Sequence, residues 1–293
     1  MSAKVDGTVD LVGYEIIEQL YSGSRTEVYR AVRESDRQPV VIKLLKRQYP
    51  TFSELVQFRN QYAIAKNLEI PGIIKPHSLE PYGNGYTLVM EDCGGISLRQ
   101  FTQGQPLKLD QFLPIAIQLA DTLYQLHQQR VIHKDIKPTN ILIHPDTNHI
   151  KLIDFSISTL LPREIQQIQS LNTLEGTLAY LSPEQTGRMN RGIDYRSDFY
   201  SLGVSFFELL TGQLPFESQD PIELVHCHIA KEPVFVDHLN PDVPPVLSAV
   251  VSKLMAKNAE DRYQSALGLK YDLEQCLMQH QFFGKIASFN LGQ

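Results

Sequence analysis

Residues 131–142 read Val131-Ile-His133-Lys134-Asp135-Ile-Lys137-Pro138-Thr139-Asn140-Ile-Leu142, and this stretch places an acid, a base and an amide within a few residues of one another. Asp135 can accept or orient the proton of a hydroxyl nucleophile, and Lys137 can neutralise a transferring phosphate. Asn140 can bind Mg²⁺ through its side-chain oxygen. A His-x-Asp pair alone fits an ordinary surface turn equally well. Because each polar residue of the full stretch has a task in phosphoryl transfer, the stretch predicts that chemistry.

A further acidic residue follows at the end of a β-like stretch, in Ile153-Asp154-Phe155-Ser156. A carboxylate at this position can hold Mg²⁺ against a polyphosphate. An isolated Asp-Phe pair more often only caps a turn. Here the pair follows residues 131–142, which predict phosphoryl transfer, and this context favours a metal ligand at Asp154.

Composition excludes several classes of protein. The chain has 293 residues, 42% of them apolar and 20% charged, which is typical of a folded globular protein. Its net charge is 27 − 33 = −6, and no basic field suggests a nucleic-acid partner. The three cysteines, Cys93, Cys227 and Cys276, lack metal-binding spacing and suit a reducing compartment.

The longest apolar stretch, residues 202–210, is too short to span a bilayer, and the N-terminus does not resemble a signal peptide. We therefore expect a cytoplasmic protein without a membrane partner.

Hydrophobic patterning divides the chain near Gly94-Gly95. Before this point we expect strands over 14–20, 27–32, 40–45, 74–79 and 86–90, and one helix over 52–68. After it we expect an amphipathic helix over 111–128, a compact loop region over 131–155, and mostly helices in the remainder. The pattern predicts an α+β protein with a small strand-rich lobe and a larger helical lobe.

Several motifs together resemble the eukaryotic-type (Hanks-type) protein kinases. Asp135, Asn140 and Asp154 look like the catalytic core of that family. Val40-Val-Ile-Lys43 matches its lysine-bearing strand. Further matches occur in the family's order, at Gly176–Glu184 (the end of the activation loop), at Asp198–Gly203, and at Arg262, which the family pairs with the glutamate at Glu184.

The resemblance implies the bilobal protein kinase fold. The N-lobe would be a small antiparallel β-sheet with one main helix, and the C-lobe would be larger and mostly α-helical. Residues 14–278 would form the kinase domain, with the N-lobe over 14–92, a hinge over 91–95 and the C-lobe over 96–278. Residues 1–13 would be an N-terminal extension, and residues 279–293 a tail or a linker stub.

By the same resemblance the chain is a protein Ser/Thr kinase that uses ATP and Mg²⁺, with the nucleotide between the lobes. The position of Lys137, two residues after Asp135, favours the Ser/Thr branch over the tyrosine kinases. The catalytic residues would be Asp135, Lys137, Lys43 and Thr177, and the metal ligands Asn140 and Asp154. Met90 would be the gatekeeper, and the backbones of Glu91 and Cys93 would bind adenine. The nucleotide-binding residues would be Leu20, Gly23, Val28, Val41, Lys43, Gln61, Met90, Glu91, Cys93 and Leu142.

The sequence departs from the family around the nucleotide. The glycine loop, Tyr21-Ser-Gly23-Ser-Arg25-Thr-Glu-Val28, keeps only its middle glycine, which predicts a stiffer or more distant loop. The hydroxyls of Ser24 and Thr26 or the side chain of Arg25 can contact phosphate instead, although Arg25 can equally be solvated.

Gln61 occupies the place of the helix glutamate that pairs with the strand lysine. It can hydrogen-bond Lys43 but cannot form an ion pair. Glu54, two turns earlier, is the alternative partner for Lys43.

Three smaller departures remain. Val41 replaces the alanine over adenine, and Ser156 replaces a glycine that permits backbone flips. Lys134 replaces an arginine that grips a phosphorylated loop, which weakens the case for activation by loop phosphorylation.

The strings Arg25–Arg30 and Leu68–Ile74 resemble a divergent bacterial branch, found in cyanobacteria, in which the kinase domain precedes ATPase-like and sensory or histidine-kinase modules. The resemblance implies a protein Ser/Thr substrate and fused or partner signalling domains. A pseudokinase-like nucleotide-binding module that regulates such a domain is the alternative. A small-molecule kinase is a third reading, against which the protein-substrate segment Gly176–Glu184 argues.

Overall fold

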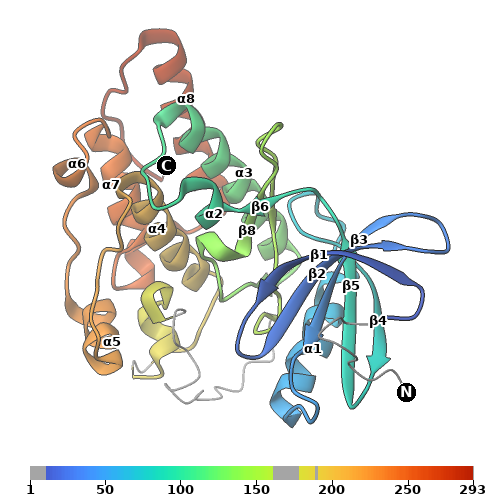
Figure 1. Cartoon of the computed structure of the whole chain (residues 1–293). Helices are drawn as coiled ribbons and strands as arrows, with labels where there is room; N and C mark the ends of the chain where they lie inside the picture. The colour runs from blue at the N-terminus through green and yellow to red at the C-terminus, as the bar shows by residue number, and fades with distance from the viewer. Residues whose placement is uncertain (1–10, 161–177, 189–190, 293) are drawn as a thin grey trace. The chain divides into compact units, whose positions relative to one another are not determined.

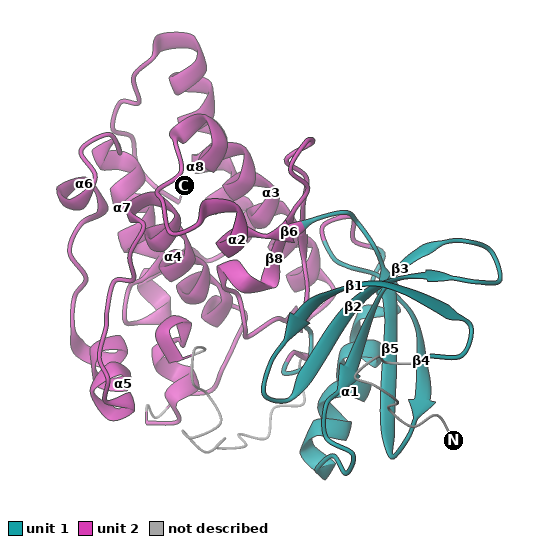
Figure 2. Cartoon of the chain, viewed as in Figure 1, with its two compact units in different colours: residues 1–69, 73–95, 154–157 teal, residues 70–72, 96–153, 158–293 magenta. Residues whose placement is uncertain are grey.

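The structure is a computed structural model that describes residues 11–160, 178–188 and 191–292 (Figure 1). It contains two compact units, coloured teal and magenta in Figure 2. Unit 1 comprises Met1–Glu69, Ile73–Gly95 and Asp154–Ile157, and unit 2 comprises Ile70–Gly72, Ile96–Ile153 and Ser158–Gln293. The division near Gly95 agrees with the change in sequence character there.

Unit 1 is an antiparallel five-stranded sheet with one helix. Its strands lie in the order β1-β2-β3-β5-β4, and helix α1 packs against β4 and β5. The elements are β1 (Tyr14–Ser22), β2 (Thr26–Arg33), β3 (Pro39–Leu45), α1 (Phe52–Ala65), β4 (Pro76–Tyr82) and β5 (Gly85–Glu91). This confirms the expected sheet with one main helix.

Helix α1 and strand β4 each end three residues away from the predicted end, whereas the bounds of the other strands in unit 1 differ by one or two residues. Helix α1 ends at Ala65 rather than Leu68, because Lys66 makes the last helical hydrogen bond, to Tyr62 O. Leu68 is still buried, so it extends the apolar pattern from the turn beyond the helix. Strand β4 covers residues 76–82 instead of 74–79, so its pairing with β5 continues into the Gly83-Asn84 turn.

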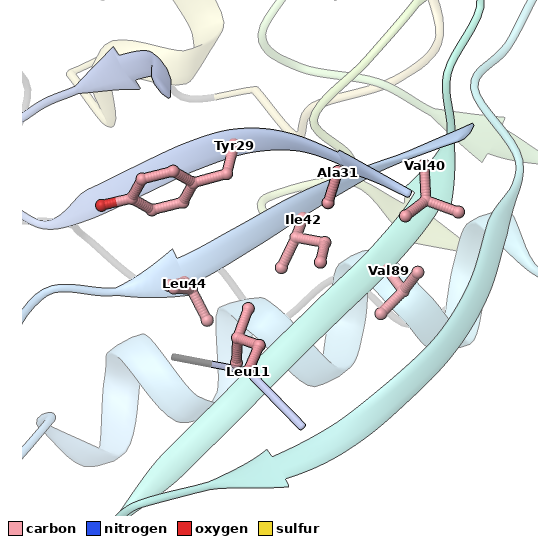
Figure 3. Close-up of a cluster of buried hydrophobic side chains, with 7 residues drawn as sticks. All are labelled: Leu11, Tyr29, Ala31, Val40, Ile42, Leu44 and Val89. Carbon is pink, nitrogen blue, oxygen red and sulfur yellow. The ribbon is translucent and has the colours of Figure 1, made fainter. Parts of the chain in front are cut away.

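The buried hydrophobic cluster in Figure 3 lies on one face of the sheet of unit 1. Alternate residues of β2 and β3 point into it, as the two-residue period of a strand requires. The intervening residues, Val28 on β2 with Val41 and Lys43 on β3, therefore lie on the opposite face. The buried cluster consists of Leu11, Tyr29, Ala31, Val40, Ile42, Leu44 and Val89.

Unit 2 is mostly helical, as expected. Helix α3 lies beside α8, and α4 packs against α7 (Figure 1). The helices are α2 (Leu98–Thr102), α3 (Leu109–Gln128), α4 (Arg196–Thr211), α5 (Pro221–Ala230), α6 (Val236–Leu239), α7 (Pro245–Leu254) and α8 (Ala266–Phe283). The short strands β6 (Ile96–Ser97), β8 (Ile141–Ile143) and β9 (Ile150–Leu152) form one ribbon, and β7 (Val131–Ile132) pairs with β10 (Thr159–Leu160). No helix in the described part of the chain is long and apolar enough to cross a membrane.

Helix α4 is the buried centre of unit 2. Its Gly203 is required by close packing, since a Cβ there would lie 2.8 Å from side-chain atoms of Leu254 and Met255. The aliphatic residues of α7 are buried.

Arg262 and Glu184 form a buried ion pair in unit 2. The two terminal nitrogens of Arg262 donate to the two carboxylate oxygens of Glu184, at 2.7 and 3.0 Å. Arg262 is 1% exposed and also donates to the main-chain oxygens of Ala256, Arg196 and Lys257. Burial alone raises the pKa of Glu184, but the hydrogen bonds and charge of Arg262 outweigh it and hold that pKa below the usual glutamate value. The pairing is the one that the family resemblance implies.

Replacing Arg262 with Met is expected to lower the free energy of unfolding by about 3–5 kcal/mol, because it strands the buried Glu184 carboxylate. The measurement is urea unfolding as a function of pH. The paired Glu184 has a depressed folded pKa, so the parent's stabilisation is complete above the unfolded pKa and is lost as the pH falls through the folded value. In the variant the unpaired, buried carboxyl is instead relieved by protonation. The stability difference should therefore shrink on acidification.

Arg191→Met is the matched control, because Arg191 pairs with the exposed Glu260 in the same unit. Its loss should cost at most about 1 kcal/mol. An equal loss of unfolding free energy in the two variants would show that the buried ion pair contributes no more to stability than the exposed one.

Candidate active site

Asp135 lies at the centre of a hydrogen-bonded cluster in unit 2. Lys137 Nζ donates to both carboxylate oxygens of Asp135, at 2.8 Å each. Asn140 Nδ2 donates to Asp135 Oδ2 at 2.7 Å and to its main-chain oxygen at 2.9 Å. These contacts fix the orientation of the Asp135 carboxylate. The structure thus brings together the three polar residues that the sequence singled out.

The Asp198 carboxylate, on helix α4, accepts hydrogen bonds from the backbone just before Asp135. Asp198 Oδ2 accepts from the backbone N–H of His133 at 3.0 Å, and Oδ1 accepts from that of Lys134 at 2.8 Å. Lys134 has a positive φ of 69°, a conformation that these two contacts help to impose. The ring of His133 contacts the main-chain oxygen of Ile153 at 3.1 Å, so this histidine has a structural role.

The charge of Asp198 is stabilised despite its complete burial. Burial by itself raises the pKa of this carboxyl, but the hydrogen bond and charge of His127 and the N–H of His133 outweigh that effect and lower it. A buried carboxylate that accepts several hydrogen bonds is a rigid anchor. Asp198 therefore fixes the loop that carries Asp135.

In unit 1 the structure brings together Lys43, Gln61 and Asp154. Lys43 Nζ, on β3, donates to Gln61 Oε1 at 3.1 Å and to Asp154 Oδ2 at 3.2 Å. Asp154 has a positive φ of 67°, which aspartate tolerates better than most residues. Its other oxygen accepts from the backbone N–H of Ser156 at 3.3 Å.

Gln61 contacts Lys43 as the sequence predicts, and Glu54 does not take its place. The Glu54 carboxylate accepts from the backbone N–H of Thr51 at 2.7 Å and from its hydroxyl at 2.9 Å, which completes a capping box at the start of α1. Glu54 thus stabilises the helix whose later turn carries Gln61.

Asn60 makes contacts near the site that the sequence did not predict. Its Nδ2 donates to the main-chain oxygens of Ser156, at 3.1 Å, and Phe155, at 3.4 Å. Helix α1 therefore holds Lys43 through Gln61 and the segment after Asp154 through Asn60. No signal in the sequence identifies Asn60, because a single amide on a helix is common and its partners are about 95 residues away.

The retained glycine of the nucleotide loop has a steric explanation. Gly23 N donates to Thr26 O at 2.9 Å and closes the turn between β1 and β2. The phenol ring of Tyr21 folds over Gly23, and a Cβ on Gly23 would collide with it. Tyr21 replaces the first glycine of the family pattern, so the middle glycine makes room for the ring. The end of β3 supports the turn, since Lys46 N donates to Arg25 O at 2.8 Å.

Most of the residues expected to bind the nucleotide belong to unit 1. Leu20, Val28, Val41, Met90 and Glu91 lie on β1, β2, β3 and β5. The register places Val41 opposite Met90, and therefore on the same side of the sheet.

Other expected site residues lie elsewhere. Cys93 follows β5 in unit 1, whereas Leu142 lies on β8 in unit 2. Thr177, expected to be catalytic, lies outside the described residues.

The candidate metal ligands have suitable chemistry. Asn140 directs its amide nitrogen at Asp135, so its side-chain oxygen faces the other way. Asp154 supplies a carboxylate, and oxygen ligands of these two kinds suit Mg²⁺. No cluster of three His, Cys, Asp or Glu side chains suited to a metal ion occurs among the described residues. Mg²⁺ commonly binds through one or two carboxylates plus substrate phosphates, so the Asp154 carboxylate is a donor of the kind that this ion takes.

Comparison with known proteins identifies the family. Residues 14–283 match the family model described as the protein kinase domain, a family that uses ATP and typically Mg²⁺. The chain is 33% identical over 265 residues to the serine/threonine-protein kinase PrkC of Bacillus subtilis, with 89% of this chain and 40% of the relative covered. It is 34% identical over 269 residues to the serine/threonine-protein kinase PknB of Mycolicibacterium smegmatis, with coverages of 89% and 42%.

A third relative has a different name. The hybrid signal transduction histidine kinase G of Dictyostelium discoideum is 36% identical over 240 residues, which cover 59% of this chain and 7% of that protein. The chain thus spans less than half the length of each of these relatives. The family match nevertheless covers nearly the whole chain, and it includes the clusters around Asp135 and Lys43. The chain belongs to the protein kinase family.

Proposed function

We propose that this chain is a protein serine/threonine kinase that transfers the γ-phosphoryl group of ATP to a Ser or Thr hydroxyl of a protein. The observation that carries the proposal is the Asp135 carboxylate, held by Lys137 and Asn140 at 2.7–2.8 Å. Two relatives that span most of this chain are named as serine/threonine-protein kinases, which supports the same activity.

Each residue has a defined role in this reaction. Asp135 orients the substrate hydroxyl and accepts its proton as the oxygen–phosphorus bond forms. Lys137 and Lys43 offset phosphate charge, and the bond from the γ-phosphorus to the bridging oxygen breaks to release ADP. Bound Mg²⁺ would supply further charge neutralisation, with Asn140 and Asp154 as its protein ligands.

The test is transfer of labelled phosphate from ATP, with Mg²⁺, to the chain itself and to a generic basic protein. Label that appears on Ser or Thr, and that is absent with a variant lacking the Asp135 carboxylate, is the expected result. Label that persists in that variant would contradict the proposed mechanism.

A pseudokinase-like regulatory module is the second candidate. Gln61 in place of the glutamate and Tyr21 in place of the first loop glycine favour it. The discriminating result is ATP binding without transfer, measured on the same preparation.

Replacing Gln61 with Glu is expected to raise kcat/KM for ATP by about two- to fivefold, because a charge-assisted hydrogen bond is stronger than a neutral one. The carboxylate would pair with Lys43 at the position where Gln61 Oε1 now accepts. Initial rates at varied ATP concentration measure the change.

Gln48→Glu, which adds the same charge at an exposed site of unit 1, is the control and should leave the rates unchanged. A decrease with Gln61→Glu would show that Lys43 needs a neutral partner in this protein.

We also propose that the chain acts as the kinase module of a larger signalling protein or complex. The similarity to a segment of a hybrid signal transduction histidine kinase supports this. An antibody against the chain should detect a native polypeptide heavier than 33.3 kDa, or a stable complex that contains it.

A further inference from the structure

The segment that follows β5 is tied to the sheet by the side chain of Asp92. Asp92 Oδ2 accepts from Arg30 Nε, on β2, at 2.6 Å. Asp92 Oδ1 accepts from the backbone N–H of Gly94 at 2.9 Å. The Asp92 side chain is 9% exposed and that of Arg30 27%, so the pair is largely shielded from water. One carboxylate therefore closes a turn around Cys93 and fastens that turn to β2.

Arg30 lies on the face of the sheet that carries the residues expected to contact the nucleotide. It is two residues after Val28 on the same strand, which places both side chains on one face. It lies opposite Val41, which in turn lies opposite Met90. Arg30 also pairs with Glu18 on β1, so its guanidinium links β1, β2 and the segment after β5.

The residue before Asp92 is fixed as well. Glu91 N donates to Lys75 O at 3.0 Å, and the Glu91 carboxylate accepts from Lys75 N at 2.8 Å. Both residues whose backbone groups are expected to meet adenine, Glu91 and Cys93, are thus flanked by side-chain contacts. The chain near Cys93 has no regular secondary structure to hold it.

We propose that Arg30 and Asp92 are positioning residues for the adenine base. Their ion pair holds the backbone of residues 91–94 in the conformation that binds the base, so this ordering is complete before the nucleotide arrives. Preorganisation of this kind improves affinity because less conformational freedom is lost on binding. The inference rests on the proposed function, since it requires that ATP binds to unit 1 through these backbone groups.

A residue with only a general structural role would affect the binding of base and phosphate alike, whereas a positioning residue for adenine would affect the base alone. Loss of the ion pair should weaken contacts to the base and leave contacts to phosphate unchanged. Lys43 is on the same sheet but makes its own contacts, to Gln61 and Asp154, which do not involve Arg30 or Asp92.

The test is calorimetric titration of the full chain with Mg-ATP, adenosine and the Mg²⁺ complex of inorganic tripolyphosphate. Arg30→Met keeps the apolar stem and removes the guanidinium. It should weaken ATP and adenosine binding by about three- to tenfold and leave tripolyphosphate binding unchanged. In the kinase assay KM for ATP should rise by the same factor, with kcat unchanged.

Variants of Asp92 separate its two contacts. Asp92→Asn keeps an acceptor for Gly94 but disrupts the contact with Arg30. Its affinities for ATP, adenosine and tripolyphosphate should therefore equal those of Arg30→Met. The double variant should be no weaker than either single one, because both remove the same interaction. Asp92→Ala also removes the acceptor for Gly94 and should weaken adenosine binding further.

Arg33→Met is the matched control. Arg33 lies on the same strand and donates to Asp36, in the exposed turn after β2, and to Gln38. It should leave all three affinities unchanged.

Two outcomes would overturn the proposal: adenosine binding unchanged in Arg30→Met, or tripolyphosphate binding weakened as much as adenosine binding. Failure of the kinase activity is distinguishable from both. A parent that binds ATP without transferring phosphate would refute catalysis, and the binding data would still decide the role of Arg30 and Asp92.

Discussion

Replacing Asp135 with Asn is expected to lower kcat for phosphate transfer by about 10²- to 10⁴-fold, the usual contribution of a positioned general base. The substitution keeps the shape of the side chain but removes the charge and one acceptor oxygen. In the structure both Asp135 oxygens accept from Lys137, and Oδ2 also accepts from Asn140. An amide would turn its NH₂ group toward one of these donors, so orientation is lost together with basicity.

The measurement is the steady-state rate of phosphate transfer, together with the Kd for Mg-ATP. We expect Kd to stay within about twofold, because the carboxylate acts on the hydroxyl and its main contribution appears in the transition state. Asp146→Asn, in an exposed turn of unit 2, is the control for the same chemical change. A rate in Asp135→Asn equal to that of the control would refute the role of Asp135 as the base.

Replacing Asp154 with Ala is expected to abolish the effect of Mg²⁺ on ATP binding and to lower kcat/KM by about 10³-fold or more. The substitution removes a proposed metal ligand and also the carboxylate that Lys43 contacts at 3.2 Å. The proposed metal ligand and the contact that holds Lys43 would thus be lost together. ATP titration with and without Mg²⁺ measures the first effect, and initial rates measure the second.

A second variant separates this effect from local strain. Asp154 has a φ of 67°, and alanine tolerates that conformation less well than Asp or Asn. Asp154→Asn keeps the backbone preference and an oxygen ligand but removes the charge, so it should weaken the Mg²⁺ dependence with little loss of stability. Asp36→Ala, in an exposed turn of unit 1, controls for loss of a carboxylate. Retained Mg²⁺ dependence in both Asp154 variants would exclude Asp154 as a metal ligand.

The sequence alone predicted the elements and contacts that depend on short-range spacing. The short stretch 27–32 and the β-branched run 40–45 predict strands, and the structure confirms both as β2 and β3. The cluster of Asp135, Lys137 and Asn140 spans one loop, so its spacing restricts the possible geometry. The pairing of Gln61 with Lys43 followed from the family resemblance, which places Gln61 at the position of the helix glutamate, and the structure shows this contact at 3.1 Å.

Only the tertiary structure revealed the contacts of Asn60, Arg30 and Asp92. The Arg30–Asp92 ion pair and the contact of Asn60 with Phe155 join partners that are 62 and 95 residues apart in sequence. An arginine on a strand or an asparagine on a helix is compatible with many partners. Which partner it meets depends on strand order, register and side-chain rotamer, and no local pattern encodes these.

The contact between Gly23 and Tyr21 could not be predicted from the sequence either, although the two residues are close along the chain. The sequence marks Gly23 as the remaining glycine of a phosphate loop, and the structure shows that the ring of Tyr21 occupies the space where its Cβ would lie. The rotamer of Tyr21 decides this contact. Local sequence therefore determined which chemical groups this protein carries and which elements hold them. Tertiary packing decided which side chains restrain those groups, because such contacts exist only once distant segments have met.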